Sequence, residues 1–422
     1  MNAVITSSQR RALRALSIAY FVQATGALSV AGSLPAISAA WQLTDAQSAR
    51  LLSIFGLTFA LAAPLVQVLF GHLHRRQLVL TGIVLFGLGA FIFALSPTYS
   101  VLIASRMMMG LGAGFIGPVL VALGSELVPE QQRGRAIGMV LLGVSMASLA
   151  GIPLATWVAS LWGAKALFAL VGVVSLLSGL NVLLTVPDKS VGTRIRLSEM
   201  AGVLSEGKYL TAFLVVFFIT SGVYSFYSFI APLIRDTYAG GKHAISAALA
   251  VLGVAGVMGN LWVTRASTRF TSEKLLLTGM TLLIADTALI TLLPKALGVL
   301  LAALILWAFA TDLLWPSQQR RIVELSSVRH RGIALALTSA FMFRRYWIWL
   351  SGSFMDLSGS GFYGLAGLSV VFIVLALASL QLSEKFKSPL KLLRLVRMKP
   401  DLCFSEYASC LASRNQNQRQ NE

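Results

Sequence analysis

The stretch QLVLTGIVLFGLGAFIFALS, residues 77–96, contains no charged side chain. Its length matches the roughly 20 apolar residues that an α-helix needs to cross a bilayer. Similar apolar runs recur along the whole chain, and we therefore predict an all-α integral membrane protein. The predicted transmembrane helices are residues 15–37, 48–70, 77–96, 99–124, 136–160, 165–186, 209–234, 244–265, 274–293, 296–317, 332–354 and 360–382.

Composition excludes several classes of protein. Hydrophobic residues make up 56% of the 422 residues and charged residues 12%, about half the charged fraction of a soluble domain. The net charge of +18 lies in short clusters between apolar runs, so nucleic-acid binding is not expected. The two cysteines, Cys403 and Cys410, give no spacing for a disulfide framework or metal cluster. No metal, cofactor or redox chemistry is predicted.

Lysine and arginine are distributed unevenly between the two predicted sides of the membrane. Placing both termini and the even-numbered loops on one side puts 26 of the 34 basic residues there. Five lie on the other side and three inside the spans. Because basic residues stay on the cytoplasmic side during insertion, we predict cytoplasmic termini and a multi-pass protein of the inner (plasma) membrane.

The two halves of the sequence repeat each other at an offset of 197 to 198 residues. Leu80-Thr81-Gly82 matches Leu277-Thr278-Gly279, Glu126-Leu127 matches Glu324-Leu325, and Arg133-Gly134 matches Arg331-Gly332. Such a parallel repeat is typical of one transporter class that binds substrate between its halves. We expect two pseudo-symmetric six-helix bundles, 1–187 and 209–382, a cytoplasmic linker 188–208 and a basic cytoplasmic tail 383–422.

Three local patterns follow one another in the first half. The loop after the second span reads Gln67-Val68-Leu69-Phe70-Gly71-His72-Leu73-His74-Arg75-Arg76. The fourth span carries Arg106 followed by Gly110, Gly112 and Gly114. The fifth span contains Gly143, Ala147, Gly151, Pro153 and Leu154. Glycines at four-residue intervals let helix backbones approach closely in lipid, so Gly143, Gly151 and Pro153 form either a hinge face or an ordinary packing face.

In their order and spacing, these patterns resemble the major facilitator superfamily over residues 10–382, close to its drug:proton antiporter and arabinose-efflux-permease-like branch. The resemblance implies an ionic network that locks the two halves through the loop after span two. Gly71 replaces the carboxylate of that family's loop. Glu126 could instead meet Arg75, Arg76 or Arg133, and Glu324 could meet Arg329 or Arg331. The alternative for each residue is a charge that only determines topology.

Five ionisable residues lie at mid-bilayer depth in the predicted spans: Arg106, Asp286, Asp312, Arg344 and Arg345. Such residues are functional candidates because their burial in lipid is unfavourable. The resemblance places Arg106 and Asp312 on cavity-lining spans, and we interpret Asp312 as the proton carrier or as a paired structural residue. Arg106 orients an anionic substrate, tunes a carboxylate, or bonds to backbone carbonyls. Asp286 ranks lower, since that family places span nine at the periphery.

Polar side chains on spans one and seven are the predicted substrate-cavity residues, Gln23, Thr25, Tyr224 and Tyr227. Polar groups in lipid need partners, so helices rich in them face a wet cavity or another helix. Hydroxylated aromatic rings suit drug-like molecules and sugars equally. An ordinary packing role is the alternative.

Span eleven departs from the small-residue helix that the resemblance implies. Its segment Phe343-Arg344-Arg345-Tyr346-Trp347-Ile348-Trp349-Leu350 is interpreted as a local reading-frame error, a real anion site or damage to the transporter. The tail 385–399 alternates basic and apolar residues, a pattern typical of an amphipathic helix on anionic lipid.

The function predicted from these features is a secondary active transporter that exports a small drug-like or sugar-like compound by alternating access, coupled to protons. The alternatives are an importer of an organic anion, with Arg106 as counter-charge, and a non-transporting sensor or scaffold. An enzyme is not expected, because paired carboxylates, a Ser-His-Asp set and a ligand cluster are missing at membrane depth.

Overall fold

The computed structural model describes residues 5–188, 191–192, 196–227, 229–292, 294–327, 329–341 and 361–398. Within these ranges the chain is helical, without a strand longer than the single bridge between His74 and Val191. Among the described residues, ten helical segments are long and apolar enough to cross a membrane. One of them, Glu130–Thr185, has 56 residues and would extend about 84 Å as a straight helix. It breaks at Gly163, where φ is +80°, and therefore supplies two crossings.

The helices of the first half cover the predicted spans, and α6 contains the end of span five together with span six. They are α1 Ser7–Trp41, α2 Asp45–Phe70, α3 Arg75–Leu95, α4 Tyr99–Glu126, α5 Arg133–Met146 and α6 Ile152–Thr185. The second half contains α8 Gly207–Tyr227, α9 Ile230–Thr237, α10 Lys242–Ala266, α11 Ser272–Leu292, α12 Leu297–Leu325, α13 Arg331–Phe341 and α15 Gly361–Met398. A short helix, α7 Leu197–Ser205, lies in the predicted linker.

Two predicted spans are interrupted, and a proline explains each interruption. The seventh span was predicted as one helix over 209–234, but α8 ends at Tyr227 and α9 starts at Ile230. A proline has no N–H to donate, and in a helix a proline ring would clash with the carbonyl four residues earlier, so the sequence at Pro232 disfavours a continuous helix. In span five, Ala147–Gly151 forms a π-helix two residues before Pro153, which cannot donate to the carbonyl of Leu149.

Other boundaries differ at the ends of the chain. The final helix was predicted to stop near residue 382, whereas α15 runs on to Met398. The predicted amphipathic stretch thus continues span twelve as one helix. Of span eleven, α13 covers Arg331–Phe341, and the segment Arg344–Leu350 lies outside the described residues.

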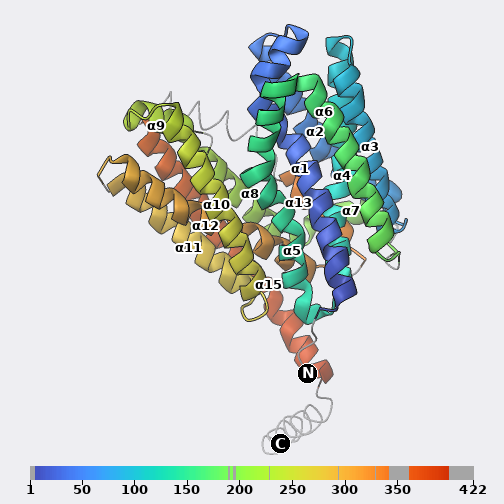
Figure 1. The fold of residues 1–422 in the computed structure, drawn as a ribbon. Helices are drawn as coiled ribbons and strands as arrows, with labels where there is room; N and C mark the ends of the chain where they lie inside the picture. The colour runs from blue at the N-terminus through green and yellow to red at the C-terminus, as the bar shows by residue number, and fades with distance from the viewer. Residues whose placement is uncertain are drawn as a thin grey trace, which may run out of the picture.

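The two halves have separate apolar cores that meet at one end of the molecule. One core is built from α1 to α6 and another from α8 to α12 and α15. Figure 1 shows the two groups of helices diverging away from the end where α1 begins. We call that end the terminal face. The short loops before α3, α5, α11 and α13 all belong to it.

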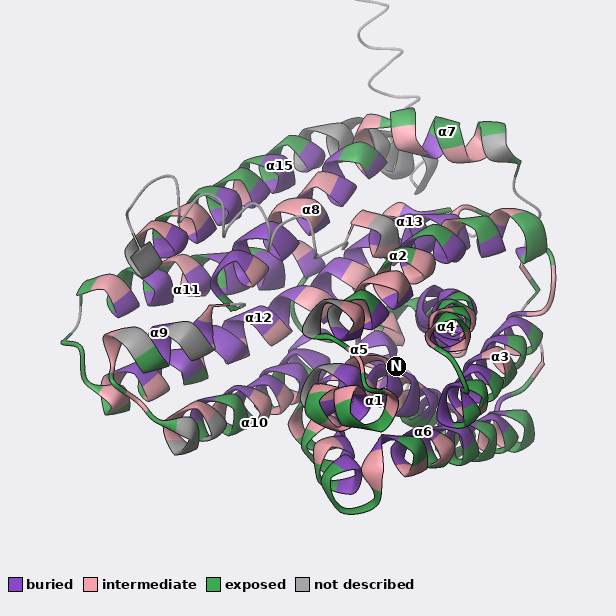
Figure 2. Ribbon diagram, turned by 90° about the horizontal axis from the view of Figure 1, so that it is seen from above, coloured by how far each residue is buried: buried purple, intermediate pink, exposed green. Residues whose placement is uncertain are grey.

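The outer surface of the bundle is apolar, as a lipid environment requires. Exposed residues line the outward sides of α3 and α6 in Figure 2. On these helices Leu95 is 80% and Leu184 75% exposed, and Leu292 at the end of α11 is 82% exposed. Such large apolar patches are rare on soluble monomers and mark contact with a membrane or a partner.

Candidate functional site

Close helix packing joins the two halves along α5 and the π-helix that follows it. A β-carbon on Gly138 would overlap the Thr264 hydroxyl of α10, and one on Gly253 of α10 would lie 2.9 Å from the Leu149 side chain. Glycine is required here because both backbones would otherwise be held apart. The contacts run along the half of α10 that is nearer the terminal face. This face of α5 therefore forms part of the interface between the halves.

Asp312 lies in the same interface, on α12. The Ser145 hydroxyl of α5 donates a 2.7 Å hydrogen bond to the Asp312 carboxylate. Gly256 and Gly259 of α10 leave room for this side chain, since β-carbons there would lie close to Asp312 atoms. The bond thus joins two residues from different halves that are 167 positions apart in the chain. Breaking the contact between the halves would expose the carboxylate.

Arg106 of α4 is fully buried within the first half. Its guanidinium donates to the Leu51 and Ala27 carbonyls at 3.3 Å each and lies 4.6 Å from the centre of the Phe55 ring. It also contacts the Met109 sulfur at 3.7 Å. These partners match the alternative in which Arg106 bonds to backbone carbonyls. The side chain joins α1, α2 and α4.

A carboxylate at the terminal face contacts arginines from both halves. Glu126 of α4 accepts from Arg75 Nε at 2.8 Å and lies 3.4 Å from an Arg331 amino group on α13. The two arginine side chains are each 4% exposed. Glu126 and Arg75 belong to the first half and Arg331 to the second. We call these three residues the terminal latch.

The corresponding residues of the second half are paired differently from the sequence expectation. Glu324 was expected to meet Arg329 or Arg331, but it contacts Arg320 Nε and the Ser272 hydroxyl, both at 2.6 Å. Ser272 occupies the position equivalent to Arg75 at an offset of 197. Because Arg320 lies one turn before Glu324 on the same helix, it satisfies that carboxylate locally. Of these two equivalent carboxylates, Glu126 thus pairs with an arginine of the other half, whereas Glu324 pairs within its own half.

Two other arginines predicted near the latch pair elsewhere. Arg76 lies 3.3 Å from Asp188 and donates to the Leu183 and Val186 carbonyls. It therefore binds the end of α6 to the start of α3 rather than meeting Glu126. Arg133 lies 3.4 Å from Glu130, three residues earlier in the chain.

A separate apolar cluster contains residues of both halves. From the first half come Val121, Ala122, Ile137 and Leu141. The second half and α7 supply Val203, Tyr209, Ala212, Phe213, Ile322, Val323, Ile333, Ala334, Leu335 and Leu337. All are nearly or fully buried. The terminal face is closed by this shared core.

The predicted cavity residues of span seven form an aromatic group with one residue that sequence reasoning missed. Tyr224 and Tyr227 rings lie edge to face at 6.0 Å, and Tyr227 stacks on Trp307 of α12 at 5.8 Å. The sequence around Trp307 does not distinguish it from the other tryptophans of the chain, which has eight in all. On α1, Gln23 is buried and the Thr25 hydroxyl lies against Gly151.

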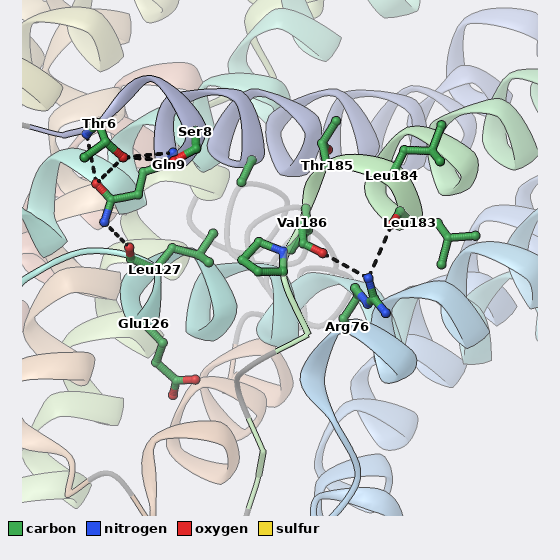
Figure 3. A pocket seen from close by; sticks show the side chains of 12 residues that line it. Thr6, Ser8, Gln9, Arg76, Glu126, Leu127, Leu183, Leu184, Thr185 and Val186 are labelled. Atoms are coloured by element: carbon green, nitrogen blue, oxygen red, sulfur yellow. Dashed lines mark hydrogen bonds between the residues drawn. The ribbon is translucent and has the colours of Figure 1, made fainter.

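A separate cavity of about 610 Å³ lies at the terminal face. Its walls come from α1, α3, α4 and α6 and the segment after α6, all in the first half. Figure 3 shows Arg76 reaching from it to Leu183 and Val186, and Gln9 reaching to Leu127. Because one half alone forms this cavity, it is not a site between the halves.

The latch gives a first prediction. Glu126→Gln leaves two buried guanidinium groups without their carboxylate, so the terminal face should open more often. Breaking a fully buried pair costs about 3–5 kcal/mol. Glu126 is 16% exposed, so we expect a smaller effect, about tenfold in the conformational equilibrium. The measurement is the rate at which a maleimide labels Val121→Cys, a residue of the shared core.

Glu130→Gln is the matched control for this substitution. Its carboxylate is 71% exposed and pairs within the first half, so labelling should stay at the wild-type rate. Equal labelling rates for both variants and the parent would show that Glu126 does not hold the face closed.

A second prediction concerns the docking of α7. Arg329 donates to both carboxyl oxygens of Glu199, at 3.0 and 2.8 Å. These hydrogen bonds lower the pKa of Glu199 below its ordinary 4.5. The stabilisation is therefore complete above pH 4.5 and is lost as the pH falls through the lowered value. Amide hydrogen exchange of α7, corrected for its intrinsic pH dependence, should speed up about two- to fivefold across that acidic window.

Glu199→Gln should give the faster exchange already at neutral pH. Glu206→Gln serves as the control, because Glu206 pairs with Lys208 beyond the end of α7. If the amide exchange of α7 changes neither at acid pH nor in Glu199→Gln, the Glu199–Arg329 pair does not hold α7 in place.

Two helical bundles that span a membrane and meet around a closed face define a secondary-transporter architecture. The chain matches the Major Facilitator Superfamily over residues 16–348 and belongs to that family of membrane transporters. The sequence prediction of the family and of the all-helical transporter fold is thereby confirmed.

Relatives agree with this assignment. An uncharacterized MFS-type transporter, YbcL of Bacillus subtilis, is 25% identical over 78% of this chain and 84% of its own length. A chloramphenicol resistance protein of Streptomyces lividans is 29% identical over 68% and 74%. A probable sugar efflux transporter of Helicobacter pylori is 23% identical over 74% and 79%. The crystal structure of FucP in the outward conformation has a TM-score of 0.73 at 16% identity, covering 89% of this chain and 99% of FucP.

Proposed function

We propose that this transporter exports a small organic compound, drug-like or sugar-like, in exchange for protons. The single observation that carries the proposal is the Ser145–Asp312 hydrogen bond, which places a carboxylate between the two halves. A carboxylate in that position changes its surroundings whenever the halves separate. It can therefore bind a proton in one conformation and release it in another, which is the requirement for coupling.

The direction of export is supported by the relatives rather than by the geometry. A chloramphenicol resistance protein and a probable sugar efflux transporter are among them. The stacked pair of Tyr227 and Trp307 suits a flat or ring-shaped compound, since aromatic faces bind both sugars and drug-like rings. Together these features favour export of such a compound.

Alternating access follows from the closed terminal face. We place this face in the cytoplasm, because the excess of basic residues lies on the side of the termini. The structure then corresponds to a state closed to the cytoplasm by the latch and the shared apolar core. Substrate from the cytoplasm enters only after Glu126 and Arg331 part and the core residues separate.

The anion-importer alternative receives less support from the geometry. It assigned Arg106 as the counter-charge, but the Arg106 partners are carbonyl oxygens, a sulfur and a ring of the first half. The buried guanidinium is therefore already bound by these groups, and it holds helices of the first half together. The scaffold alternative is separated from transport by the experiment below.

The test is accumulation of a panel of sugars, dyes and antibiotics, chloramphenicol included, in cells that express the wild-type chain or an empty vector. Export predicts lower accumulation of at least one compound, and a proton uncoupler should abolish the difference. Higher accumulation would support import, and no difference for any compound would support a scaffold. Either result would overturn the proposal.

A further inference from the structure

Asp286 is a second carboxyl group buried in the helical bundle, and the mechanism above does not use it. It lies in α11 with 0% exposure. Both of its carboxyl oxygens are shielded from solvent and have no hydrogen-bond partner among the described residues. A carboxylate ion in such surroundings would be strongly unfavourable, because neither water nor a donor stabilises its charge.

A second polar group without a partner lies at the same depth. Gly279 of α11 packs against the Ala310 carbonyl and Leu314 of α12, which fixes the register of these antiparallel helices. Seven residues further along α11, about 10 Å at the helical rise, comes Asp286. The same distance back along α12 from Leu314 leads to Trp307. Its indole N–H is buried and lacks a partner among the described residues.

The internal repeat gives the same pairing independently. At the offset of 197, Asp286 corresponds to Gly89, and at 198, Trp307 corresponds to Met109. In the first half these two positions pack directly, since a β-carbon on Gly89 would lie 2.8 Å from the Met109 side chain. The equivalent positions of the second half therefore bring Asp286 and Trp307 to one place between α11 and α12.

Cationic partners are missing from the helices packed most closely on α11. Between residues 361 and 383, α15 contains no acidic or basic residue. The charged residues of α12 are Asp312, Arg320, Arg321 and Glu324, all at least five positions nearer the terminal face than Trp307. On α11 itself, Glu273 and Lys274 stand at the first turn. The part of these helices near Asp286 therefore carries no cationic side chain. The hydroxyl of the adjacent Thr287 donates to the Leu283 carbonyl of its own helix.

We propose that Asp286 is a proton-binding site of the second half, which holds its proton in this conformation. The carboxyl group shares its place with the indole N–H of Trp307, which can stabilise the charge once the proton leaves. Trp307 also stacks on Tyr227, so a shift of that ring pair would alter the surroundings of Asp286. Only this link to the cavity rests on the proposed function; the bound proton does not.

Infrared spectroscopy of the full-length protein in lipid bilayers tests the site without any transport assay. A protonated carboxyl group absorbs separately from an ionised one. At pH 7 the wild type should show a protonated carboxyl band that Asp286→Asn removes. Asp188→Asn is the control, because Asp188 contacts Arg76 and His74 and should contribute no such band.

Asp286→Glu provides a second reading if the asparagine variant does not fold. It keeps the carboxyl group in a longer side chain, so the band should move rather than vanish. A wild-type spectrum without a protonated carboxyl band at pH 7, or one that both variants leave unchanged, would show Asp286 to be ionised and would overturn the proposal. Failure of export with the band intact would overturn the proposed function alone.

Discussion

Asp312→Asn should reduce proton-driven export at least about tenfold at matched membrane levels. Asparagine keeps the size and can still accept a hydrogen bond from Ser145, so the interface between the halves should assemble. It cannot take up or release a proton, and the coupling step is lost. The measurement is compound accumulation with and without an uncoupler, which should no longer differ for the variant.

Ser145→Ala separates the hydrogen bond from the proton. It removes the donor that lies 2.7 Å from the carboxylate and leaves Asp312 able to titrate. A hydrogen bond to a charged group contributes about 1.5–3 kcal/mol, so the pH dependence of export should shift while export persists. Ser148→Ala is the control, because Ser148 is exposed and contacts only the Val144 carbonyl of its own helix turn. Wild-type coupling in Asp312→Asn would exclude Asp312 as the carrier.

Gly138→Leu should prevent the terminal face from closing and should lower transport at least about tenfold. A β-carbon at this position already overlaps the Thr264 hydroxyl of α10, and a leucine adds more atoms to the same place. Overpacking costs about 1–3 kcal/mol, which is about 5- to 150-fold in the balance between closed and open states. Distances between spin labels on the two halves at the terminal face should lengthen.

Two further variants identify the cause of that effect. Gly56→Leu places the same side chain where a β-carbon meets nothing within 4 Å, and transport should be unchanged. In Gly138→Ala the new methyl group meets the Thr264 hydroxyl. Adding Thr264→Ala removes that hydroxyl and should restore part of the activity that Gly138→Ala loses. Closed-state distances in Gly138→Leu would show that α5 and α10 need not approach at this point.

The sequence predicted the membrane class and most of the helices for a simple reason. Whether a segment enters lipid depends on the summed transfer free energy of its own twenty or so side chains. The run at 77–96 is therefore recognisable without neighbours, and α3 occupies Arg75–Leu95. The interruptions of spans five and seven could also have been predicted locally, because these spans contain Pro153 and Pro232. The topology was likewise predicted from local sequence, namely the number of basic residues in each loop.

The partners of the charged residues could not be predicted from local pattern. Asp312 and Asp286 are the same residue type in similar apolar runs. Asp312 nevertheless meets Ser145 of the other half, whereas Asp286 lies buried without a partner among the described residues. Glu126 finds Arg331 across 205 positions, and Arg106 binds carbonyls of two other helices. Trp307 joins the aromatic group through ring contacts with Tyr227 and Phe226 of α8, a helix remote in the chain.

By itself, the sequence determined that this chain is a membrane-spanning helical bundle of the transporter class, because hydropathy is a property of each segment. Only the tertiary structure decided which carboxylate lies between the halves, which arginine completes the terminal latch, and that the terminal face is closed. Those features depend on distances between helices that are remote in the chain, and such distances are set by the packing of small residues such as Gly138 and Gly256.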